Sequence, residues 1–207
     1  MSPNQQVIHL LRGPTAARIR FKTPAFTVDR RVFLRVAEEI EKGNVVVQVG
    51  AEIPASARYL NDIRIALVLP FLGGVSLPVR PNTIQLAAPI SGRAWEGVAL
   101  HQCAHAFFDI AKASIGAQDE EAIGLLISVL YARMTGMARS RWDRRDHPNH
   151  LAGKVADKLL HAYAVGSHTI PAVDDALFLV LKFAIRIHPN YRGEPPATRG
   201  ASFPHDG

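Results

Sequence analysis

The chain has 207 residues, of which 48% are hydrophobic and 20% are charged, and its formal net charge is +6. This length suits one domain, and the apolar content is enough for a sizeable core, so a chain disordered throughout is excluded. The only cysteine, Cys103, rules out an intramolecular disulfide and therefore a disulfide-stapled secreted fold. The basic balance favours acidic partners, such as nucleic acid or anionic membrane surfaces.

We expect neither a secretion signal nor a membrane-spanning helix. Residues 1–11 lack a charged region followed by a long apolar run, which a signal peptide requires. The most apolar segment, residues 63–79, is interrupted by prolines, an arginine and a glycine pair, whereas a spanning helix needs about 20 apolar residues. The prediction is a protein without a membrane partner, either cytoplasmic or released without a signal peptide.

The first ninety residues predict a small sheet with one helix. Apolar residues recur at helical spacing from 30 to 42, between the capping residue Asp29 and the stop signal Gly43. Residues 18–21 are a short strand candidate, and residues 70–81 read as a turn-rich connection. Runs of β-branched and apolar residues predict strands at 45–49, 63–69 and 83–87.

The remainder of the chain predicts helices. The periodicity indicates helices over residues 93–114, from a cap at Asp119 to about 135, over 151–165 and over 174–188. The first two are joined by a short link, so they should pack as antiparallel neighbours. The predicted fold class is α+β, with one domain over residues 1–190 and a loose Pro- and Gly-rich tail over 191–207.

The first long helix carries His101 and His105, and side chains four residues apart lie on one helical face. Two imidazoles held in this way can bind one divalent metal, as in the H-E-x-x-H helix of zinc peptidases. Here the stretch reads H-Q-x-x-H, so Gln102 stands where a general base would be needed. Asp109 extends the series by one more turn. The stretch therefore predicts a metal-site scaffold, with zinc as the candidate ion.

Three acids open the next helix, and one of them could supply a third ligand. Glu121 is preferred, because the apolar and small residues that follow it at helical spacing should point inward. Glu120 is the runner-up. The competing interpretation is that all of the acids, including Asp119, interact only with the helix dipole.

The motif carries a family resemblance. The run His101-Gln102-Cys103-Ala104-His105-Ala106 with Asp109, followed by Glu120-Glu121-Ala122, resembles the H-E-x-x-H-A…D…E-x-A pattern of gluzincin-type zinc-metallopeptidase-like proteins, in particular small bacterial ones. The resemblance spans about residues 95–135. It implies that His101, His105 and Glu121 correspond to metal ligands and that Gln102 occupies the place of the catalytic glutamate.

Three explanations fit Gln102: a natural pseudoenzyme, an engineered Glu-to-Gln knockout, or histidines that bind no metal. The leading functional hypothesis is a metallopeptidase-like protein that has lost its general base. The alternatives are a non-enzymatic structural or interaction protein with a peptide or protein partner, and a basic protein associated with nucleic acid. A nucleic-acid-associated protein would use the cluster of arginines around Trp142, which consists of Arg139, Arg141, Arg144 and Arg145. A solvated loop is the simpler interpretation of this cluster. Cys103 is expected to be a buried packing residue.

Overall fold

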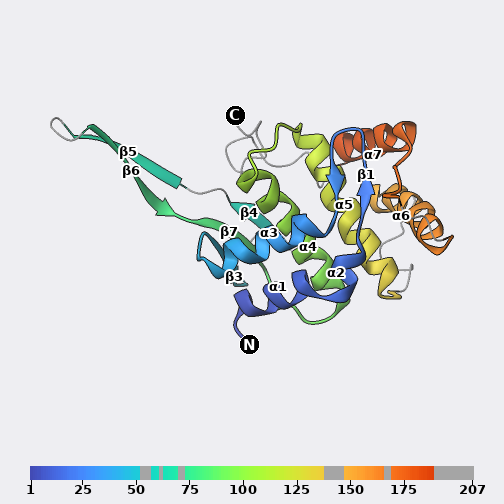
Figure 1. The fold of residues 1–207 in the computed structure, drawn as a ribbon, viewed down its shortest axis with the longest axis horizontal. Helices are drawn as coiled ribbons and strands as arrows, with labels where there is room; N and C mark the ends of the chain where they lie inside the picture. The colour runs from blue at the N-terminus through green and yellow to red at the C-terminus, as the bar shows by residue number, and fades with distance from the viewer. Residues whose placement is uncertain (52–56, 61–62, 70–72, 138–146, 166–168, 189–207) are drawn as a thin grey trace.

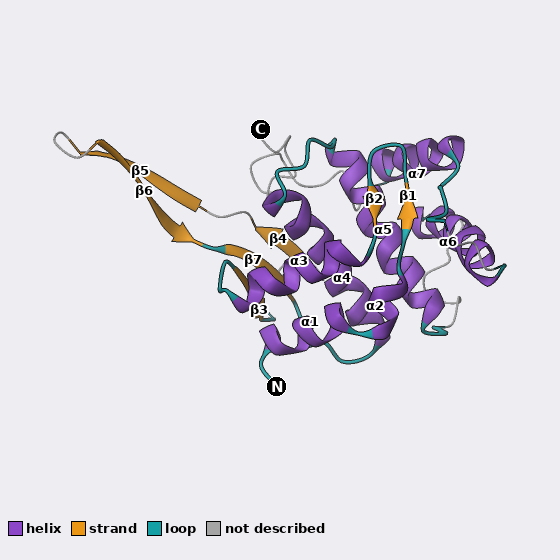
Figure 2. Cartoon of the chain, viewed as in Figure 1, coloured by secondary structure: helices purple, strands orange, loops and turns teal. Residues whose placement is uncertain are grey.

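A computed structural model describes residues 1–51, 57–60, 63–69, 73–137, 147–165 and 169–188. Short strands lie in the first half of the chain and long helices dominate the second half (Figure 1). The described strands all lie before residue 87, and the helices that begin at residue 93 and beyond follow them, so the predicted α+β class is confirmed. Figure 2 shows the helices and strands in separate colours. The arginine cluster around Trp142 and the C-terminal tail lie outside the described residues.

The N-terminus is helical, contrary to the prediction of one helix in the first ninety residues. Helix α1 (Pro3–Arg12) begins with a capping box, in which Ser2 and Gln5 satisfy each other's backbone N–H groups, and Pro3 occupies the first turn. A short α2 (Pro14–Arg18) follows. It occupies the start of the segment considered as a strand, so the first strand, β1 (Phe21–Lys22), begins later and pairs with β2 (Thr27–Val28).

The predicted helix at 30–42 is confirmed as α3 (Arg30–Glu41). The Asp29 carboxylate accepts a hydrogen bond from the Arg31 N–H at the start of α3. At the other end, Gly43 has a positive φ of 77°, which favours glycine at a helix stop. Helix α3 packs its apolar face against α1 and α4, the helix of the histidine motif.

A three-stranded sheet supports the histidine helix. Its order is β3 (Val45–Val49), β7 (Asn82–Leu86) and β4 (Ala57–Leu60), with β7 parallel to β3 and antiparallel to β4. The predicted strands at 45–49 and 83–87 are therefore found, with β7 displaced by one residue, while β4 was not predicted. The Val47 N–H, on edge strand β3, donates to Asn4 Oδ1 of α1, which ties the helix to the sheet.

A separate two-stranded ribbon projects from the body of the molecule (Figure 1). It consists of β5 (Ile63–Leu69), as predicted, and β6 (Gly73–Arg80), which contradicts the predicted turn-rich connection at 70–81. Pro78 and the glycine pair at 73–74, which usually end regular structure, lie within a paired strand here. In a two-stranded ribbon both strands are edges, where proline is tolerated, and the pairing register shifts near Pro78.

The predicted helices of the second half are confirmed, with small changes at their ends. They are α4 (Arg93–Ile110), α5 (Ala117–Met134), α6 (Pro148–Ala164) and α7 (Asp175–Ile187). The predicted cap at Asp119 is wrong, because α5 already begins at Ala117 after Gly116. Asp174 does cap α7, by accepting a hydrogen bond from the Leu177 N–H. Among the described residues, no helix combines the length and apolar character needed to cross a membrane.

Candidate metal centre

Helices α4 and α5 form an antiparallel pair, as the short link between them predicted. Small and polar residues meet at several points along this contact. The Tyr131 hydroxyl donates to Glu96 over 2.8 Å near one end, and the histidines meet the first turns of α5 near the other. The facing pairs run in opposite directions along the two helices: Glu96 with Tyr131, Gly97 with Ser128, His101 with Gly124, and His105 with Glu120.

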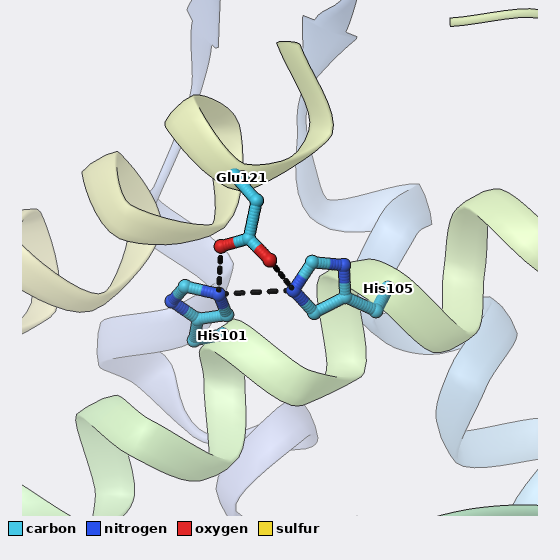
Figure 3. A group of neighbouring side chains, drawn as sticks. All are labelled: His101, His105 and Glu121. Carbon is cyan, nitrogen blue, oxygen red and sulfur yellow. Dashed lines mark hydrogen bonds and ion pairs between the residues drawn. The ribbon is translucent and has the colours of Figure 1, made fainter. Parts of the chain in front are cut away.

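His101, His105 and Glu121 converge at this contact (Figure 3). The two Nε2 atoms are 3.0 Å apart. One carboxylate oxygen of Glu121 lies 3.4 Å from Nε2 of His101, and the other lies 3.5 Å from Nε2 of His105. Both imidazoles thus turn the same nitrogen toward one carboxylate from the neighbouring helix, and the three residues could hold a metal ion.

The separations suit a small divalent ion. Zinc binds histidine nitrogens and carboxylate oxygens at about 2.0–2.2 Å, so neighbouring ligands of a tetrahedral ion lie about 3.3–3.5 Å apart. The distances from the imidazoles to the carboxylate already match this value. The distance between the two imidazoles is slightly shorter, so the rings would separate by a few tenths of an ångström around an ion. The donor set, two histidines and one carboxylate, is one that zinc uses.

Glu120 lies behind His105 on the side away from Glu121. The His105 Nδ1–H donates to Glu120 Oε1 over 2.5 Å, and both side chains are almost fully buried. A carboxylate bonded to one ring nitrogen fixes the tautomer and orientation of a metal-binding histidine. The structure therefore brings both candidate acids to the site in different positions: Glu121 faces both imidazoles, and Glu120 supports one of them.

The two glutamates also control the charge of His105. Burial alone lowers the pKa of His105, but the charges of Glu121 and Glu120 and the hydrogen bond to Glu120 together raise it to about 9. The two carboxylates therefore favour the protonated form of His105, whose Nε2 faces His101 and Glu121.

The third acid of the cluster points elsewhere. Asp119 forms an ion pair with Lys182 of α7, with 2.6 Å between the carboxylate oxygen and the ammonium nitrogen. Successive helical residues are rotated by about 100°, so three consecutive acids cannot all face α4. The interpretation that all three serve only the helix dipole does not account for these separate contacts.

Gly124 allows α5 to approach His101 closely, and it was not recognised from the sequence. A Cβ built at Gly124 would lie 2.9 Å from Cδ2 and 3.0 Å from Nε2 of His101. The signal was available, because a glycine inside a helical pattern often marks a close packing contact. Gly124 therefore sets the position of the His101 ring relative to the carboxylate one turn earlier.

We expect Gly124→Ala to weaken metal binding by about tenfold or more, as changes that misplace a ligand ring do. The added methyl must displace the imidazole, since it would otherwise overlap it. Isothermal titration with Zn²⁺ measures the loss. Gly97→Ala is the matched control, because its Cβ would meet Ser128 Oγ at 3.1 Å in the same interface but away from the histidines. Equal affinities in the two variants would contradict this role for Gly124.

The other residues of the motif have different surroundings. Gln102 is partly buried on α4 between the two histidines. Asp109 does not join the three converging side chains. It accepts a hydrogen bond from the Tyr59 hydroxyl over 2.7 Å, which links α4 to strand β4. Cys103 is fully buried, and burial raises the pKa of its thiol, so the expected packing role is confirmed and a nucleophilic thiolate is disfavoured.

Comparisons of the chain with protein-family models, with curated proteins and with solved structures find no match. The resemblance to gluzincin-type proteins therefore rests on the motif residues alone. What the fold contributes is the geometry around that motif.

Proposed function

We propose that the chain is a zinc-metallopeptidase-like protein whose metal site is retained and whose catalysis is degenerate because Gln102 replaces the general base. The observation that carries the proposal is the convergence of His101, His105 and Glu121 between α4 and α5. The carboxylate of Glu120 behind His105 adds support, because it favours the tautomer that leaves Nε2 available for an ion.

The residues of such a site would have different roles. His101, His105 and Glu121 would hold the ion, and Glu120 orients His105. Zinc in a three-ligand site supplies a Lewis acid that polarises a bound carbonyl or water. The Gln102 amide can donate and accept hydrogen bonds, so it can orient a water molecule, but it has no group that takes up a proton near neutral pH. Loss of general-base assistance typically costs roughly 10²–10⁴ in rate.

The proposal is tested by metal analysis of the full chain after equilibration with Zn²⁺ and removal of excess ion. The expected result is one zinc per chain, and little or none in His101→Ala. Circular dichroism of both proteins without metal serves as the folding control. Equal zinc content in the two proteins would contradict the assignment of the site. Zinc retained without hydrolysis of a broad peptide library supports a degenerate site, whereas rapid zinc-dependent hydrolysis would contradict the degenerate part of the proposal.

Glu120 can be tested separately from the ligands. We expect Glu120→Gln to lower zinc affinity by roughly 10–100-fold, the usual effect of losing a carboxylate that orients a ligand histidine. The amide keeps the shape and a hydrogen-bond acceptor but removes the charge. Glu39→Gln is the matched control, since Glu39 is also a buried carboxylate but is bonded to Lys42 and Asn44. Chelator competition measures both variants, and an unchanged affinity in Glu120→Gln would exclude the orienting role.

A further inference from the structure

Helix α7 carries an apolar stripe on the face turned away from the rest of the molecule. The inner face of α7 packs on α5 and α6 through Phe178, Leu181 and Ile185. The helix lies at the periphery of the fold, at the end opposite the projecting ribbon (Figure 1). Four large apolar side chains on the outer face are between 45% and 65% exposed: Leu179, Val180, Phe183 and Ile187.

These exposed residues recur at helical spacing and form one continuous stripe. Positions 176, 179, 180, 183 and 187 fall within about 100° of the helix circumference, and the first of them is an exposed alanine. No charged residue interrupts the stripe. Exposed apolar residues are ordinary when single, but a continuous patch of this kind marks an interaction surface.

The charges beside the stripe indicate what covers it. Asp175 and Arg186 are both exposed, and neither takes part in an ion pair within the described part of the chain. They are eleven residues apart, which is close to three helical turns, so they lie on the same edge of the stripe at its opposite ends. The edge therefore carries a negative charge at the start of α7 and a positive charge at its end.

This arrangement is self-complementary under a two-fold axis. When two copies of a helix pack antiparallel through the same face, each edge meets the same edge of the other copy in the reverse direction. Asp175 of one copy then meets Arg186 of the second, and the reciprocal pair forms at the other end. Along the helix axis, the midpoint of the two charges lies at the height of Val180, which is near the middle of the apolar stripe, so one two-fold axis at that height serves both the charges and the apolar residues.

We propose that α7 is a homodimerisation surface, on which the outer face of α7 packs antiparallel against the same face of a second copy of this chain. The interface has an apolar centre of Val180 and Phe183, with Asp175 and Arg186 paired across the rim. One helix from each copy buries less than the roughly 1,200–2,000 Å² of a standard interface. The dimer is therefore weak, and its population depends on protein concentration.

Sedimentation velocity over a concentration series of the full chain tests the association. The expected result is a reversible monomer–dimer equilibrium that Phe183→Glu abolishes. Val165→Glu is the matched control, because Val165 is also exposed, at 69%, but lies just after α6. Circular dichroism establishes that each variant is folded. A chain that remains monomeric up to its solubility limit, or a dimer that survives Phe183→Glu in folded protein, overturns the proposal.

The antiparallel geometry has its own test in charge reversal and cross-linking. Asp175→Arg and Arg186→Asp should each weaken the dimer by roughly tenfold, since each change affects two symmetry-related pairs, and the double reversal should restore it. With a mild oxidant added, Val180→Cys, near the two-fold axis, should form an intermolecular disulfide, whereas Val165→Cys should not. The native Cys103 is buried and will not interfere. Failure of the double reversal to restore association, or equal cross-linking of both cysteine variants, excludes this arrangement.

Discussion

Replacing His105 by alanine is expected to abolish high-affinity zinc binding. The change removes one of the three proposed ligands, so the loss should exceed the roughly 10–100-fold expected when only an orienting residue is lost. It also deprives Glu120, which is 1% exposed, of its hydrogen bond from His105. Losing a hydrogen bond at a buried charged group costs about 1–3 kcal/mol, so the variant should also be less stable than the parent chain. Zinc titration and thermal unfolding without metal measure the two effects.

Two further variants separate metal binding from folding. Glu121→Gln removes the charge of a proposed ligand whose side chain is 30% exposed, so it should lose zinc affinity while lowering the unfolding temperature less than His105→Ala does. His161→Ala removes an exposed histidine from α6 and should leave both quantities unchanged. If Glu121→Gln binds zinc as tightly as the parent chain, the carboxylate facing the histidines is not a ligand.

The histidine pair and one facing carboxylate could be predicted from the sequence because they depend on local periodicity. A four-residue spacing places His101 and His105 on one helical face wherever α4 lies in the fold. The short link between α4 and α5 then brings the start of α5 close to the end of α4 that carries the two histidines. These two facts were enough to identify Glu121 and Glu120 as candidates.

What separates Glu121 from Glu120 is the rotation of α5 about its own axis, which local periodicity does not determine. The close approach at Gly124 fixes this rotation, because residues three and four positions earlier on a helix share its face. Glu121 then turns toward both imidazoles, while Glu120 reaches the far nitrogen of His105. The packing of α5 against α4 determines the different positions of Glu121 and Glu120. The sequence pattern shows only that residue 124 is a glycine.

The errors in the fold have similar physical causes. The capping box of Ser2 and Gln5 at α1 is a local pattern, Ser followed three residues later by Gln, so this helix could have been predicted from the sequence. Strand β6 was missed for a different reason. Proline and glycine usually end regular structure, and only pairing with β5 along a ribbon that has two edges makes Pro78 acceptable. Nonlocal pairing of this kind cannot be read from one segment alone.

The activity of the chain is expected to depend on position 102. Gln102→Glu should retain zinc and gain hydrolysis of some peptide, by roughly 10²–10⁴ over the parent chain, because the carboxylate can accept a proton and return it to the leaving amine. The comparison requires equal zinc occupancy, since an added carboxylate also changes metal affinity. Assays of a broad peptide library with both zinc-loaded proteins measure the gain.

Two companion variants show whether the gain is due to the carboxylate. Gln102→Ala removes the amide without adding a base and should remain inactive. Gln102→Glu combined with His101→Ala should lose both zinc and the new activity, because the added carboxylate acts only beside the ion. Hydrolysis that persists in the combined variant would place the chemistry elsewhere in the chain. If zinc-loaded Gln102→Glu cleaves nothing in the library, the absence of a general base does not explain a lack of hydrolytic activity at this site. The His101, His105 and Glu121 cluster is then better explained as a metal site kept for binding or assembly.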